Sequence, residues 1–330
     1  MLHWIQHNRL YDLARQGERL TPWWSILGLG VVFVLVSSLF ALPVELAQFA
    51  LSAFSNPSSL EALEEEASLM LLSPWLSGLL MGLMLALSFG ALIAFVWLWI
   101  RHYEKRSFFT LGFEQHQVLW QYARGFLIGL LAFSANVGLM AIFGYVSIEE
   151  SDLSRVGLSA LAGVLLILPG WLVQGAAEEV LTRGWMLPVL SARYRPWLGI
   201  LLSSLFFALM HGINPNVDLL ALFNLLLYGV FAALYVLREA SLWGICAFHS
   251  AWNWAQGNLF GLAVSGQNTG VGTLLDLMET GPDWFTGGAF GPEGGIASTL
   301  VLLLSIACVV MWSPSAQADT QESPSGSSPA

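Results

Sequence analysis

Seven residues with chemically useful side chains lie in three otherwise apolar stretches of this sequence. In chain order they are Glu178, Glu179, Arg183, Phe207, His211, His249 and Asn253. An ionisable side chain inside a membrane-spanning helix costs about 2.5–3.5 kcal/mol on insertion scales, and it marks function by default. A carboxylate and a neighbouring imidazole can together take a proton from water. The residue types therefore point to one hydrolytic site.

Helical spacing separates the roles of the two glutamates. Glu179 and Arg183 are four residues apart with the acid first, which is the favourable order for an ion pair on one helix face. Glu178 points about 100° away around the helix, so we expect it to lack a local partner and to serve as a general base. His249 and Asn253 are also four residues apart. Both would project from one face as hydrogen-bond donors that can stabilise a tetrahedral oxyanion.

Counting residues from the basic ends of their helices places Glu178, His211 and His249 at one depth. At about 1.5 Å per residue, each lies roughly 16–22 Å from that end. The agreement requires the helix that carries Glu178 to continue toward Ser191, with a kink at Pro188. We therefore expect the three side chains to converge.

The elements that would position these groups are transmembrane helices. Of the 330 residues, 56% are hydrophobic and 10% are charged, whereas soluble domains carry about 25% charged residues. A bilayer is crossed by about 20 apolar residues. Eight stretches qualify, and they are 24–50, 76–100, 120–146, 157–180, 197–213, 217–237, 241–262 and 296–313. The predicted fold is an all-α, polytopic transmembrane helical bundle of about eight spans.

The basic residues support this count, because eight spans place nearly all of them on one side. These residues are Arg9, Arg15, Arg19, Arg101, Lys105, Arg106, Arg193, Arg195 and Arg238. The opposite loops are acidic, and Arg155 is their basic residue. Basic loops stay in the cytoplasm, so both termini should be cytoplasmic. The total of 12 Lys and Arg against 22 Asp and Glu argues against a nucleic-acid partner.

The chain divides into three parts. Residues 1–23 form a cytoplasmic or interfacial N-terminal segment, 24–313 form the membrane-embedded domain with a motif core at about 120–262, and 314–330 form a polar tail that should be disordered. The loop 265–295 is rich in Gly and acidic residues, and no function is assigned to it. Membrane lipids are the expected surroundings of this protein.

The three motifs resemble, in order and spacing, those of the CPBP family, which includes the type II CAAX prenyl endopeptidases and many bacterial relatives. The segment 106–113 is also similar to one that often precedes the core in bacterial members. The resemblance implies an intramembrane endopeptidase acting on a membrane-associated or lipidated peptide or protein, in an integral membrane protein of the bacterial plasma membrane. It implies a division of roles in which Glu178 and His211 activate water, His249 and Asn253 hold the oxyanion, and Glu179, Arg183 and Phe207 support the site.

Two alternatives stay open. In the first, Glu178, His211 and His249 would ligate zinc with water as the fourth ligand, although the sequence has no HExxH pattern and we expect no cofactor. Cys246 and Cys308 lie in apolar runs and suggest no thiolate site. In the second, the chain would be a non-catalytic immunity or scaffold protein, or a proton-coupled transporter that uses the same buried polar cluster.

Overall fold

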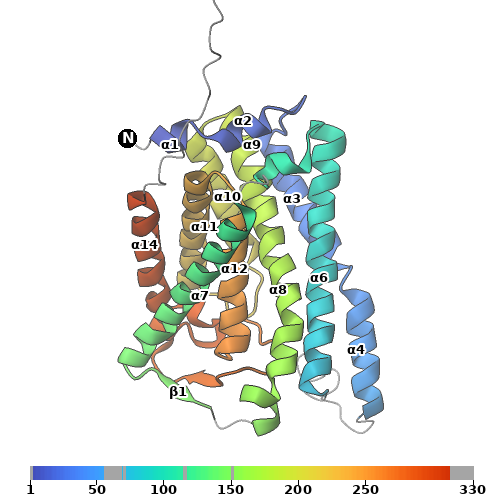
Figure 1. The fold of residues 1–330 in the computed structure, drawn as a ribbon, viewed down its shortest axis with the longest axis vertical. Helices are drawn as coiled ribbons and strands as arrows, with labels where there is room; N and C mark the ends of the chain where they lie inside the picture. Colours follow the sequence, from blue (N-terminus) through green and yellow to red (C-terminus); the bar gives the residue numbers. More distant parts are fainter. Residues whose placement is uncertain (1–2, 56–68, 70–71, 114–116, 150–151, 313–330) are drawn as a thin grey trace, which may run out of the picture.

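The computed structural model describes residues 3–55, 69, 72–113, 117–149 and 152–312. The predicted disordered tail, 314–330, lies outside the described residues. Each of the eight apolar stretches contains helix, so the prediction of an all-α polytopic bundle is confirmed (Figure 1). The long elements are α3 (Trp23–Ser38), α4 (Leu42–Ser55), α6 (Pro74–Trp99), α7 (Val118–Ile142), α8 (Leu161–Glu179), α9 (Leu187–Arg193), α10 (Pro196–Met210), α11 (Leu219–Glu239), α12 (Trp243–Trp254) and α14 (Ile296–Met311).

Some of these helices are long enough to cross a membrane, and others are shorter. Within the described residues, five helical segments are long and apolar enough to cross a membrane, and the longest runs from Leu161 to Arg193. Helices α10 and α14 are apolar but have 15 and 16 residues. At about 1.5 Å per residue they are shorter than the hydrocarbon core of a bilayer. Helix α10 therefore ends at Met210 before it has crossed the full hydrocarbon core, and the chain turns there, at His211.

The first predicted span is broken into α3 and α4. The break lies at Leu39–Ala41, immediately before Pro43. A proline ring removes a backbone donor and clashes with the carbonyl four residues earlier, so Pro43 disfavours continuation of the helix through Leu39. The resulting elbow changes the direction of the chain beside α6 (Figure 1).

The predicted continuation of the fourth span past Glu178 is confirmed. Helix α8 passes into a π-helical segment at Val180–Met186, and α9 follows it to Arg193. The irregularity precedes Pro188, which has no N–H to donate into the preceding turn. The wider π turn includes Arg183, and such segments are frequent at functional sites.

The two described ends of the chain lie at one end of the bundle, together with the short helices α1 (His3–Gln6) and α2 (Arg9–Ala14) (Figure 1). Asn8 donates a 2.7 Å hydrogen bond to the carbonyl of Leu237. The Arg238 guanidinium lies 5.0 Å from the Trp4 ring centroid and donates to the carbonyl of Trp312. These contacts place the N-terminal segment, the end of α11 and the end of α14 side by side, as an even number of spans requires.

A buried polar network also fixes this end of the bundle. The carboxylate of Glu104, in a π turn at Ile100–Glu104, accepts hydrogen bonds from Thr21 at 2.6 Å, Trp185 at 3.0 Å and Arg106 at 2.7 Å. Arg106 continues the network to Thr110, in the short 3₁₀ turn Phe108–Leu111. Because Trp185 belongs to the π segment after α8, the network holds the segment that carries Arg183.

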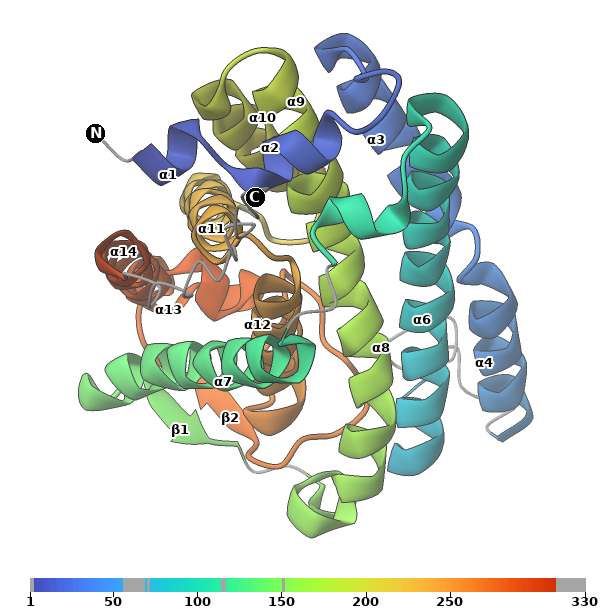
Figure 2. The ribbon, with the colours of Figure 1, turned by 45° about the horizontal axis from the view of Figure 1, so that its top comes forward.

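The long loop between α12 and α14 folds back under the bundle. After a π turn at Ala255–Leu259, β2 (Leu277–Glu279) pairs antiparallel with β1 (Val146–Ile148), which follows α7 (Figure 2). The short helix α13 (Asp283–Thr286) and the 3₁₀ turns Gly288–Phe290 and Pro292–Gly294 lead into α14. The loop is thus an ordered part of the fold, and its inner residues reach the centre of the molecule.

Close contact between α8 and α12 brings the first and third motifs together. A Cβ atom on Gly175 would lie 2.6 Å from Ser250 Oγ and 2.7 Å from Ser250 N. Only glycine fits so near another backbone. The two glutamates follow Gly175 by one turn, and His249 precedes Ser250, so this crossing sets the acid–imidazole contacts.

Candidate active site

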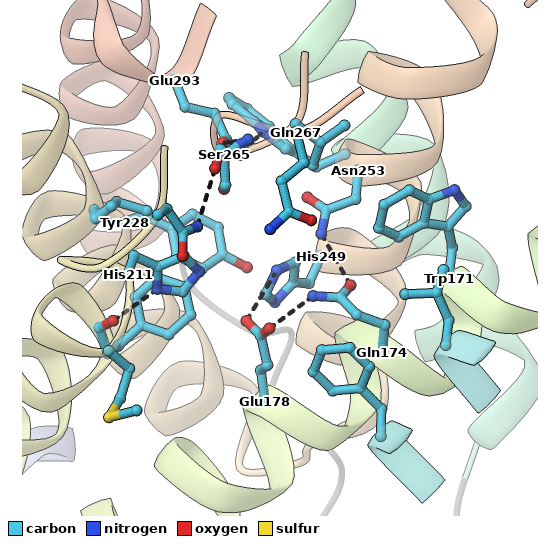
Figure 3. A pocket seen from close by; sticks show the side chains of 18 of the residues that line it. Trp171, Gln174, Glu178, His211, Tyr228, His249, Asn253, Ser265, Gln267 and Glu293 are labelled. Carbon is cyan, nitrogen blue, oxygen red and sulfur yellow. Dashed lines mark hydrogen bonds and ion pairs between the residues drawn. The ribbon is translucent and has the colours of Figure 1, made fainter. Parts of the chain in front are cut away.

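One cavity of about 280 Å³ unites the predicted residues. Its wall includes Glu178, His211, His249, Asn253 and Phe207, and their side chains surround a common space (Figure 3). Glu179 and Arg183 are absent from this lining and lie behind it, with side chains 0% exposed. The structure therefore brings the three motifs together and divides them into a cavity-facing set and a buried support.

Glu178 has a local partner, so the expectation that it would stand alone is wrong. Gln174, one turn earlier on α8, donates a 2.8 Å hydrogen bond from Nε2 to Glu178 Oε1. Residues four apart on a helix are neighbours. The position of Gln174 four residues before Glu178 in the sequence could therefore have predicted this hydrogen bond. Glu178 Oε2 is buried and has no hydrogen-bond partner among the described residues. That oxygen lies 3.7 Å from His249 Nε2 and keeps lone pairs that can accept a proton.

His249 is held between the two glutamates. Its Nδ1 lies 2.9 Å from Glu179 Oε1, and its Nε2 lies 3.7 Å from Glu178 Oε2. An ionised carboxylate only accepts hydrogen bonds, so Nδ1 carries a hydrogen and donates it to Glu179. The other nitrogen, Nε2, faces Glu178 and the cavity. The helical spacing alone suggested that His249 is a free donor beside Asn253. In the structure its imidazole is instead oriented by Glu179.

The predicted Glu179–Arg183 ion pair is present. Arg183 Nη1 lies 3.2 Å from Glu179 Oε1, and the guanidinium stacks 4.6 Å from the Phe207 ring centroid and 5.7 Å from that of Tyr228. Tyr228 OH donates to the same Glu179 oxygen at 3.3 Å. Three donors thus converge on one carboxylate oxygen. A buried charge requires such compensation.

Asn253 is linked to Glu178 through Gln174. Asn253 Nδ2 donates a 2.9 Å hydrogen bond to Gln174 Oε1, whose own amide nitrogen donates to Glu178 (Figure 3). An amide nitrogen has two hydrogens, so Asn253 keeps a second donor. Gln174 was missed by the sequence reasoning. Tyr228 was also missed, and nothing in the sequence distinguishes it from other tyrosines in apolar helices.

His211 occupies the opposite wall. Its Nδ1 lies 2.8 Å from the carbonyl oxygen of Phe207, and within the described part of the chain no hydrogen bond or ion pair joins it to Glu178. A carbonyl accepts, so Nδ1 carries the hydrogen and Nε2 of the neutral ring has a free lone pair. Its partner Phe207 packs between His211, Tyr228 and His249. The space between His211 and Glu178 is open to a third molecule.

These residues do not fit a three-ligand metal site. Over the ranges that the structure describes, no group of three His, Cys, Asp or Glu side chains is placed to hold a metal ion. A catalytic zinc ion would need nitrogen and oxygen ligands at about 2 Å from a common point. We therefore derive no chemical step through a metal.

Comparison with known proteins identifies the segment that contains the motifs. Residues 160–255 match the family model described as type II CAAX prenyl endopeptidase Rce1-like. All three motifs, and also Gln174 and Tyr228, lie within the matched range. No curated protein and no solved structure matches the chain.

Proposed function

This chain belongs to the CPBP family of membrane proteases, and on that premise we propose that it is a glutamate-dependent intramembrane endopeptidase. It would hydrolyse a peptide bond of a membrane-associated or lipidated substrate with water activated by Glu178 and His211. The observation that supports this proposal is the buried Oε2 of Glu178, which makes no hydrogen bond to a described residue, in a side chain that lines the same cavity as His211. Glu178 and His211 can both accept protons, and the cavity that they line is large enough for a water molecule.

The steps of the reaction follow from the positions of the donors and acceptors. Glu178 takes a proton from water, assisted by the Nε2 lone pair of His211, and the water oxygen bonds to the scissile carbonyl carbon. The oxyanion then accepts hydrogen bonds from Nε2 of the doubly protonated His249 ring and from the second amide hydrogen of Asn253. Protonated Glu178 next gives its proton to the amine nitrogen as the C–N bond breaks. A carboxylic acid and an amine leave the site, and in water the acid passes its proton to the amine, which gives a carboxylate and an ammonium group.

Glu179 and Arg183 act through His249 in this scheme. Because Glu179 accepts from His249 Nδ1 and Glu178 Oε2 lies 3.7 Å from Nε2, the two carboxylates fix the ring and favour its doubly protonated form, in which Nε2 also carries a hydrogen where the oxyanion needs a donor. Loss of one oxyanion donor typically costs about 2.7–4 kcal/mol in transition-state stabilisation. Asn253→Ala should therefore lower kcat by roughly 100- to 1,000-fold.

The decisive experiment is cleavage of a panel of fluorogenic, membrane-tethered peptides by purified protein in detergent. Wild type is compared with Glu178→Ala and with Glu45→Gln, a matched control in which another membrane-helix glutamate, outside the cavity, is changed. We expect Glu178→Ala to lose cleavage while it inserts and elutes like wild type, and Glu45→Gln to stay active. A folded Glu178→Ala protein with wild-type cleavage would contradict the proposal. The non-catalytic alternative makes that opposite prediction, and the family match does not favour it.

A further inference from the structure

A tight turn in the loop between α12 and α14 reaches the cavity. Val264 and Gln267 exchange two backbone hydrogen bonds of 2.8 and 3.0 Å, so Ser265 and Gly266 form the two central residues of a hairpin turn. Both have positive φ, 49° and 84°, which is typical of a type I′ turn. This turn fixes the direction in which the side chain of the next residue, Gln267, projects from the backbone.

Glu293 holds the turn in this conformation. Its Oε2 accepts hydrogen bonds from Ser265 N at 3.0 Å and Ser265 Oγ at 2.7 Å, and its Oε1 accepts from Trp252 Nε1 at 3.2 Å. A left-handed backbone at a residue other than glycine costs free energy and persists where the surroundings over-determine it, often at functional sites. The carboxylate thus joins the turn to α12, the helix of His249 and Asn253.

The turn is also attached to the element that follows His211. Asn214 Nδ2 donates a 3.0 Å hydrogen bond to the carbonyl of Ser265. A Cβ atom on Gly266 would lie 2.1 Å from the carbonyl oxygen of Pro215, so glycine is required at this contact. The turn is therefore fixed against two of the three motif-bearing elements.

Gln267 lies where its side chain can contact a molecule bound in the cavity. Its side chain lines the cavity and points toward His249 and Asn253 (Figure 3). The residue is exposed, and its carboxamide makes no hydrogen bond to another described side chain or backbone group. A carboxamide has one acceptor oxygen and two donor hydrogens, which matches the N–H and C=O groups of a peptide. A rigid turn thus presents an unused peptide-binding group beside the reacting groups.

We propose that Gln267 is a substrate-binding residue that hydrogen-bonds to the main chain of the substrate peptide next to the scissile bond, and that Glu293 is its positioning residue. This inference rests on the proposed endopeptidase function. Gln267 binds the ground state and the transition state alike, because it lies outside the set that moves protons. Its loss should therefore raise KM and leave kcat nearly unchanged.

The test uses the membrane-tethered fluorogenic peptide that wild type cleaves fastest, with analogues in which one peptide N–H at a time is replaced by an ester oxygen. Gln267→Ala should raise KM by about 2- to 13-fold, the loss expected for one hydrogen bond between uncharged groups. One ester position should weaken cleavage by wild type and have no effect on Gln267→Ala. The matched control is Gln16→Ala, which removes an exposed carboxamide outside the cavity lining and should leave KM unchanged.

A second variant separates positioning from folding. Glu293→Gln should raise KM in the wild-type background and should add nothing to Gln267→Ala, since both changes remove the same contact. Additive effects of the two changes would contradict the role given to Glu293. Wild-type KM and an unaltered ester profile in Gln267→Ala would overturn the inference, while inactivity of Glu178→Ala in the same assay would leave the endopeptidase proposal standing. Retained activity of Glu178→Ala would instead contradict the endopeptidase proposal itself.

Discussion

Gln174 and Glu178 are joined side chain to side chain along one turn of α8, at 2.8 Å between Gln174 Nε2 and Glu178 Oε1. The oxygen of the same amide accepts from Asn253 Nδ2 at 2.9 Å. One carboxamide thus orients both the acid proposed to activate water and an amide proposed to hold the oxyanion. The other oxygen, Glu178 Oε2, makes no hydrogen bond to a described residue and lies 3.7 Å from His249 Nε2.

The first prediction concerns this amide. Gln174→Ala should lower kcat by roughly 10- to 100-fold with little change in KM, because two reacting groups lose their orientation while the peptide-binding surface remains. Steady-state cleavage of a membrane-tethered peptide measures both constants. Gln174→Ala and Asn253→Ala should combine with less than additive loss, since they interrupt one hydrogen-bonded chain. Fully additive losses would show that the two residues act independently.

The second prediction concerns the buried ion pair. Arg183→Met removes the arginine that pairs with the Glu179 carboxylate at 0% exposure, and removal of one partner of a buried pair typically costs about 3–5 kcal/mol. Thermal unfolding in detergent should show a clearly lower Tm, partly recovered in the double variant Arg183→Met/Glu179→Gln. Arg15→Ala is the matched control, since the Arg15–Asp12 pair is exposed and its loss should leave Tm unchanged. A wild-type Tm for Arg183→Met would contradict a structural role for the pair.

The third prediction is a dependence of stability on pH. Burial raises the pKa of Glu279, on β2, from 4.5 to about 7, against the lowering effects of hydrogen bonds from Thr286 and Gly288. Between these values folded Glu279 binds more protons than the same residue in the unfolded chain. The contribution of Glu279 to the free energy of unfolding should therefore be fully present below pH 4.5 and be lost as the pH rises to 7. Tm measured across this window in wild type and Glu279→Gln tests the expectation. The variant should lose that part of the slope, and an identical slope in both would assign it to other groups.

The fourth prediction is that cleavage does not depend on a metal ion. The described His, Cys, Asp and Glu side chains form no three-ligand group, and proton transfer by Glu178 needs none. Cleavage by wild type should therefore survive treatment with a chelator and dialysis. Loss of cleavage that added zinc restores would instead assign Glu178, His211 and His249 as ligands, with a rearrangement of the two imidazoles.

Some relationships could be predicted from the chain alone because they are local. The i, i+4 spacing of Glu179 and Arg183 predicts their contact on any helix, and the apolar stretches predict the spans since few other structures satisfy a backbone in a bilayer. The same rule applied to Gln174 would have given Glu178 its partner. The break before Pro43 also follows from a local clash.

Other features depend on contacts between segments far apart in the sequence. The sequence by itself determined which helices carry the acid, the imidazoles and the amide, because their types and spacings stand out against an apolar background. Only the tertiary structure decided that His249 lies between two glutamates, since this depends on the approach of Gly175 to Ser250. Likewise, only the fold brings the turn at Ser265–Gly266 beside the motifs, because its anchors, Asn214 and Glu293, are 51 and 28 residues away from Ser265. Helical periodicity carries no information about contacts over such separations.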